Sequence, residues 1–214
     1  MGKTMSAHCH SHAAQDGGPR YRKVLWIALV VNAAMFFVEA GASFVSGSTA
    51  LAADSADFAG DATNYGLSLA AIAAGGLWQS RAALAKGLAM ALYGVGVLAY
   101  AVWRVVQGGA PEPATMGLIG TMALVANVGV AVLLYTYRTG NANMRSVWLC
   151  TRNDAIGNVA VLVAAAGVFG TGTLWPDIAV AVLMAGLGLR AAYQVIGQAR
   201  AELRSANGRD LKLG

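Results

Sequence analysis

The stretch Leu51-Ala-Ala-Asp54-Ser-Ala-Asp57-Phe-Ala-Gly-Asp61-Ala-Thr-Asn64 places three carboxylates and an amide inside an otherwise apolar segment that continues to about Leu77. The segment is long enough to cross a bilayer, and charges at membrane depth are costly and seldom kept without a use. Asp57 and Asp61 are four residues apart, so a helix stacks them on one face. Two oxygen ligands on one face form half of a cation site, and another part of the chain must supply the rest.

The composition of the chain indicates a polytopic helical membrane protein. Of its 214 residues, 57% are hydrophobic and only 12% are charged, whereas soluble domains carry roughly 25% charged residues. Small residues such as the 27 glycines let transmembrane helices approach closely. The apolar runs predict an all-α fold, a bundle of six transmembrane helices, at about residues 24–45, 50–77, 84–106, 116–137, 147–169 and 175–196.

Polar segments precede and follow this membrane domain. We expect a polar cytoplasmic tail over residues 1–23, the six-helix domain over 24–197 and a short basic cytoplasmic tail over 198–214. The first tail contains a cluster of soft-metal ligands, namely His8, Cys9, His10 and His12. The cluster is compatible with a metal-capture tail, with a disordered tail that anchors at the membrane surface, and with a partial cloning remnant.

The basic residues predict the orientation of the six spans. An even number of spans places both termini on one side of the membrane. Of the 15 Lys and Arg residues, all but Arg104 and Arg152 fall in or beside the segments that this topology assigns to the cytoplasm. The positive-inside rule therefore predicts cytoplasmic termini, in what we expect to be a bacterial inner (plasma) membrane. Because the +5 charge is spread over membrane-flanking anchors, it does not indicate a nucleic-acid partner.

The fifth predicted span offers the second half of the cation site. Cys150 and Asp154 are again four residues apart. At 1.5 Å per residue, Asp57 and Asp61 lie about 10–17 Å below the outer end of their span, and Cys150 and Asp154 about 5–11 Å from the inner end of theirs. In a core of about 30 Å the two pairs approach each other near the middle. We predict that these four residues are ligands of a divalent transition metal: the thiolate favours Zn or Cd, and the carboxylates keep Mn, Fe and Co open.

The other polar residues of the spans have competing interpretations. Glu39 is a candidate for a proton or ion role. Asp54 could line an exit path, pack within the bundle or cap the helix start, and Cys150 could equally be a small core residue. Arg152 is expected to point away from the site. Four amide side chains are expected to form hydrogen bonds between helices, namely Asn32, Asn64, Asn127 and Asn158. Asn64 is also a candidate for supporting the site.

These residues carry a resemblance to a known family. Glu39-Ala-Gly, Ser46-Gly-Ser-Thr-Ala-Leu-Ala-Ala-Asp54-Ser-Ala-Asp57 and Asp61 resemble the first helical hairpin of the cation diffusion facilitators. Asp57 and Asp61 match the family's [His/Asp]-x-x-x-Asp pattern, and Asp154 matches the end of its His-x-x-x-Asp pattern on the fifth helix. Cys150 stands where the family has histidine, and we expect a short form without the family's C-terminal cytoplasmic domain.

The resemblance implies export of a divalent metal ion through six helices, usually by dimers and in exchange for protons. We therefore expect a Zn-like efflux transporter that works by alternating access, exchanges metal for protons, forms a homodimer through the membrane domain and has no tightly bound cofactor. The alternative from another class is a metal-binding membrane sensor or accessory subunit that does not transport. An enzyme is not expected, since no nucleophile and base stand together.

Overall fold

A computed structural model describes residues 18–71, 76–139 and 142–210. The described residues form six long helices and one short 3-10 helix, and they contain no strand. The elements are α1 (Pro19–Ser46), α2 (Thr49–Ala71), α3 (Gly76–Gln107), α4 (Pro113–Leu134), η1 (Tyr135–Tyr137), α5 (Ala142–Thr171) and α6 (Trp175–Asp210). The predicted all-α, six-helix bundle is confirmed.

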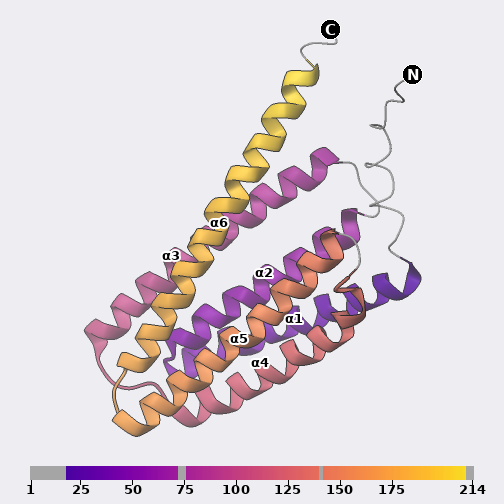
Figure 1. Cartoon of the computed structure of the whole chain (residues 1–214). Coiled ribbons are helices and arrows are strands. Elements are labelled where there is room, and N and C mark those ends of the chain that lie inside the picture. Colours follow the sequence, from indigo (N-terminus) through magenta and orange to yellow (C-terminus); the bar gives the residue numbers. More distant parts are fainter. Residues whose placement is uncertain (1–17, 72–75, 140–141, 211–214) are drawn as a thin grey trace, which may run out of the picture.

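Successive helices run in opposite directions, so the start of α1 and the end of α6 lie at the same end of the bundle (Figure 1). Helices α1, α2, α4 and α5 lie together, and α3 and α6 run beside them as a pair (Figure 1). Helix α2 packs against α1, α3, α5 and α6. This central position allows the polar residues of α2 to face four neighbouring helices.

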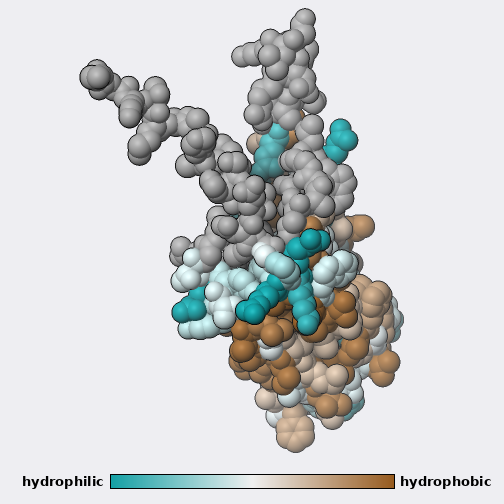
Figure 2. Space-filling view, turned by 90° about the vertical axis from the view of Figure 1, so that its right-hand side faces the viewer, coloured by the Kyte–Doolittle hydropathy of each residue, from teal (hydrophilic) through white to brown (hydrophobic). Residues whose placement is uncertain are grey.

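The surface of the bundle is apolar where lipid would contact it. Large apolar side chains such as Phe37, Phe44 and Phe169 are exposed, and Figure 2 shows apolar residues covering the lower part of one face below a hydrophilic band. Within the described ranges, five helices are long and apolar enough to cross a membrane. The remaining helix, α2, is continuous, but three aspartates interrupt its apolar sequence.

Two helix ends show how the sequence sets the connections. Helix α1 ends at Gly47, whose φ of 71° is left-handed and favours glycine. A Cβ atom at Gly47 would also lie only 2.7 Å from a guanidinium nitrogen of Arg104. Helix α4 starts after Glu112, whose carboxylate accepts hydrogen bonds from the amides of Ala114 and Thr115. The hydrogen bonds from Thr115 lower the pKa of this exposed carboxyl.

Helices α1, α3, α5 and α6 extend beyond the predicted spans, whereas α2 ends at Ala71 and α4 at Leu134, before the predicted ends at about residues 77 and 137. Helix α3 already begins at Gly76, so Arg81, which precedes the predicted start at about residue 84, is helical. Helix α6 likewise continues to Asp210, and Ser80 donates a hydrogen bond of 2.6 Å to Glu202 between these extensions. The physical reason is that hydropathy locates the membrane crossing, whereas charged residues can continue a helix into water. The proposed boundaries of the two tails stay predictions.

Candidate functional site

Polar residues of α2 alternate with the apolar clusters that hold the bundle together. Ala50 to Ala53 belong to one buried cluster, Phe58 to a second and Tyr65 to a third. Asp54 and Asp61, between these anchors, are only 1% and 6% exposed. The packing of α2 therefore holds its carboxylates inside the bundle, where each needs a partner.

The central contact joins α2 to α5. The carboxyl groups of Asp61 and Asp154 face each other at short range. The Tyr65 hydroxyl donates to Asp61 over 2.9 Å and shares a hydrogen bond of 2.6 Å with the Thr151 hydroxyl. Tyr65 and Thr151 were not singled out from the sequence, although each lies one helical turn from a predicted ligand.

Lys86 of α3 places a positive charge beside Asp61. The ammonium group of Lys86 donates a hydrogen bond to the side-chain oxygen of Asn64 and interacts electrostatically with Asp61. The Asn64 side chain also lies beside Asp61. The predicted supporting role of Asn64 is therefore compatible with its contacts, and Lys86 is a neighbour that the sequence analysis had counted only among the basic residues in or beside the cytoplasmic segments.

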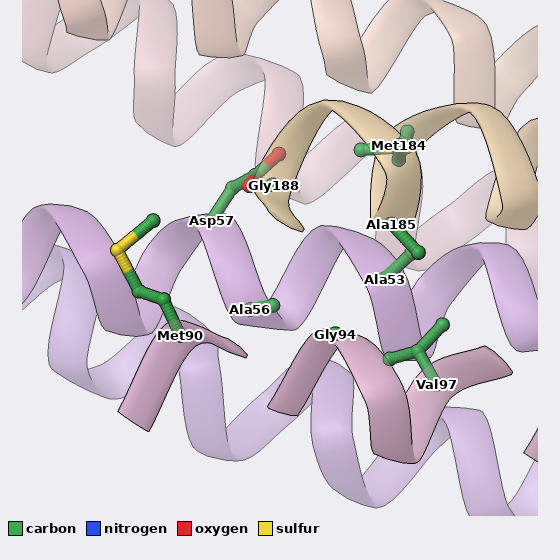
Figure 3. A pocket seen from close by; sticks show the side chains of 9 residues that line it. All are labelled: Ala53, Ala56, Asp57, Met90, Gly94, Val97, Met184, Ala185 and Gly188. Carbon is green, nitrogen blue, oxygen red and sulfur yellow. The ribbon is translucent and has the colours of Figure 1, made fainter. Parts of the chain in front are cut away.

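Asp57 faces a different part of the bundle. It lines a cavity of about 20 Å³ between α2, α3 and α6, and Figure 3 shows its carboxylate directed toward Gly188 of α6, with Met90 of α3 on the other side. A volume of about 10–15 Å³ is enough for one water molecule. The cavity therefore offers space beside Asp57 for a small polar species.

A series of side-chain hydrogen bonds links α4, α5 and α2 and ends at Asp54. Asn127 of α4 donates to Asn158 over 2.7 Å, and Asn158 of α5 donates to Asp54 over 2.6 Å. These bonds confirm the predicted interhelical role for Asn127 and Asn158. The Asn32 amide donates only to its own helix, at the carbonyl of Ala28. On the other side of Asp54 lies the fully buried Glu39 of α1.

The start of α2 is capped by a residue that the sequence analysis missed. Asp177 of α6 is 1% exposed. It accepts hydrogen bonds from the Ser48 hydroxyl (2.6 Å), the Thr49 hydroxyl and amide (2.6 and 2.8 Å) and the Ala50 amide (3.0 Å). The suggestion that Asp54 caps this helix is therefore wrong, because Asp54 lies a full turn inside it. A lone acid in the first turn of α6 carried no sequence signal for a contact this distant.

The structure brings together only two of the four predicted metal ligands, and the side chain of one other lies outside the described residues. Asp61 and Asp154 meet, whereas Asp57 faces the cavity, and no three acidic, Cys or His side chains within the described part form a group that could hold a metal. The Cys150 side chain and the tail residues His8, Cys9, His10 and His12 lie outside the described residues. Arg152 is exposed, 5.4 Å from the Trp148 ring centre, as expected for a residue pointing away from the site.

The arrangement is suited to exchanging cations. Paired carboxyl groups inside an apolar bundle can hold either protons or a positively charged ion. Apolar outer faces and a polar interior of this kind define an integral, multi-pass membrane protein.

Comparison with known proteins identifies the family. A model of the cation efflux transmembrane domain matches residues 25–203, and the chain therefore belongs to the cation efflux family, the cation diffusion facilitators that its motifs resemble. The chain is 28% identical over 204 residues to the cadmium, cobalt and zinc/H(+)-K(+) antiporter of Bacillus velezensis, covering 88% of this chain and 63% of the relative.

A second similar protein is also named as a metal cation transporter. The metal cation efflux system protein CzcD of Cupriavidus metallidurans is 27% identical over 187 residues, which cover 82% of this chain and 58% of the relative. The chain thus spans less than two thirds of the length of these relatives.

Proposed function

We propose that this protein exports a divalent, Zn-like metal ion from the cytoplasm in exchange for protons, by alternating access to a site between α2 and α5. The observation that carries the proposal is the contact between Asp61 and Asp154 inside a bundle of the cation efflux family. Asp57 and Cys150 complete the proposed ligand set, and a change of side-chain rotamer or helix orientation would bring Asp57 from the cavity to the metal. The names of the relatives, which mention cadmium, cobalt, zinc and protons, support this cargo and exchange.

Exchange for protons follows from the chemistry of the ligands. A metal ion binds carboxylate and thiolate only after their protons leave, so metal and protons compete for the same groups. The facing carboxyl groups of Asp61 and Asp154 are two of the groups that would exchange protons for the metal. Protons from the outer side would displace the ion outward, and the ion would displace protons on the cytoplasmic side.

Flux through liposomes tests the proposal. The purified protein is reconstituted, with a zinc-sensitive dye and a pH-sensitive dye trapped inside separate liposome samples. Zinc entry coupled to opposing proton movement is the expected result. Zinc flux without proton movement would contradict the exchange, and zinc binding without flux would favour the alternative of a sensor or accessory subunit.

Replacing Cys150 by histidine should change the selectivity of the site. We expect Cys150→His to raise the preference for Zn over Cd by about tenfold, because imidazole is a harder ligand than thiolate. Competition between the two metals for the purified protein measures the ratio. An unchanged ratio would argue that Cys150 is not a ligand.

Removing the charge of Lys86 should tighten metal binding. The ammonium group lies beside Asn64 and Asp61, where it repels an approaching dication. We expect Lys86→Gln to bind zinc about tenfold more tightly than the parent protein. Zinc titration of the detergent-solubilised protein measures this, with Lys86→Arg as the matched control that keeps the charge. Weaker binding in Lys86→Gln would show instead that Lys86 positions the ligands.

The surroundings of the protein are part of the proposal. We place it in a bacterial inner membrane with both termini in the cytoplasm, which the distribution of Lys and Arg supports. We also propose a homodimer held by the membrane domain. Cross-linking in native membranes tests the dimer, and accessibility labelling from each side tests the orientation.

A further inference from the structure

Glu39 is the most completely buried acid in the described part of the chain. It is 0% exposed, and neither of its carboxylate oxygens has a hydrogen-bond partner there. It faces the carboxyl of Asp54 at short range, without a regular hydrogen bond between them. Asp54 is 1% exposed and bonds on its other side to Asn158. The proposed metal site uses neither acid.

This pair requires a positive charge of its own. A buried carboxylate with no partner is strongly unfavourable, and two facing carboxylates repel each other. The Asn158 amide supplies one donor to Asp54 and none to Glu39. No described residue of α4 is acidic or basic. The groups that act on Glu39 through charge are Asp54 and Asp57 of α2, and Glu39 in turn acts on Tyr93 of α3. None of these is a cation.

We propose that the Glu39–Asp54 pair binds a further proton that is exchanged for the metal, in addition to the protons that compete with the metal at its ligands. The inference rests on the proposed transport function. It adds to competition at the ligands, because this further proton lies between α1 and α2, whereas the metal lies between α2 and α5.

The shared helix explains how the two sites communicate. Asp54 lies less than one turn from Asp57 on α2, so a dication at Asp57 and Asp61 lowers the negative potential that retains a proton on the pair. Proton binding at the pair weakens metal binding by the same factor, since coupling between two sites is reciprocal. A proton arriving from the outer side would thereby help to release the ion there.

Two modes of zinc movement separate this proposal from competition at the ligands alone. In the first mode, a pH gradient with an acidic lumen drives zinc accumulation into liposomes. In the second, liposomes loaded with unlabelled zinc exchange it for radiolabelled zinc with no pH gradient. Exchange needs only the metal site and its movement, whereas accumulation also needs the coupling proton.

Glu39→Gln keeps the size of the side chain and removes its titration. We expect it to lose gradient-driven accumulation by about tenfold or more while exchange remains within about threefold of the parent protein. Asp54→Asn should separate the two modes in the same way, and it decides the question alone if Glu39→Gln does not fold. Ser43→Ala is the matched control, a buried polar residue one turn away on α1, and should leave both modes unchanged.

Three results have distinct meanings. Normal accumulation in Glu39→Gln would overturn the proposal, because the proton would then bind elsewhere. Loss of exchange together with accumulation would also overturn it, because Glu39 would then serve the metal site or the fold. Absence of zinc exchange in the parent protein would instead refute the transport function itself.

Discussion

Asp61→Asn should reduce zinc flux by roughly 100-fold or more, the largest effect expected of a single substitution in this protein. Asparagine has nearly the same shape as aspartate, and its oxygen can still accept the hydrogen bond that the Tyr65 hydroxyl donates over 2.9 Å. The substitution therefore removes the negative charge while preserving the contact between α2 and α5. Proteoliposomes with a trapped zinc-sensitive dye measure the initial rate.

The control for Asp61→Asn lies on the opposite face of the same helix. Thr63 is exposed, and its hydroxyl donates only to the carbonyl of Ala59 in its own helix. Thr63→Ala should keep the parent rate. Asp154→Asn should behave as Asp61→Asn does, because the two carboxyl groups are paired. Full flux in both aspartate variants would show that the proposed site is wrong.

Asp177→Ala should destabilise the folded protein by roughly 3 kcal/mol, because it leaves buried donors without an acceptor. The carboxylate accepts bonds from the Ser48 and Thr49 hydroxyls and from the amides of Thr49 and Ala50. The hydroxyls can turn to other acceptors, but the two amides at the start of α2 cannot. We expect the midpoint of thermal unfolding in detergent to fall by about 5–10 °C.

A second capping carboxylate provides the comparison. Glu112 also accepts two backbone amides at a helix start, but it is exposed, so water can replace it. Glu112→Ala should therefore lower the midpoint much less than Asp177→Ala, although each removes one cap. Equal shifts for the two variants would contradict the argument that burial makes the Asp177 contact strong.

The sequence by itself determined the class of fold and pointed to residues of the candidate site. Apolar runs of membrane length specify the helices, and the four-residue spacing of Asp57 and Asp61 places them on neighbouring turns of one helix. The same reasoning found Asp154 on α5, which meets Asp61 in the structure. These inferences succeed because hydrophobicity and helical period are local properties of the chain.

The tertiary structure decided which side chains meet. Asp57 and Asp61 share a face in sequence terms, yet Asp57 faces the cavity beside α3 and α6, because α2 is surrounded by four helices and about 40° of rotation between the two residues is enough to give them different neighbours. The cap that Asp177 places on α2 joins residues 127 to 129 positions apart. The contacts of Lys86 with Asn64 and of Glu39 with Asp54 also depend on how whole helices pack. No local pattern encodes such contacts, because burial and crossing geometry arise only when all the helices are assembled.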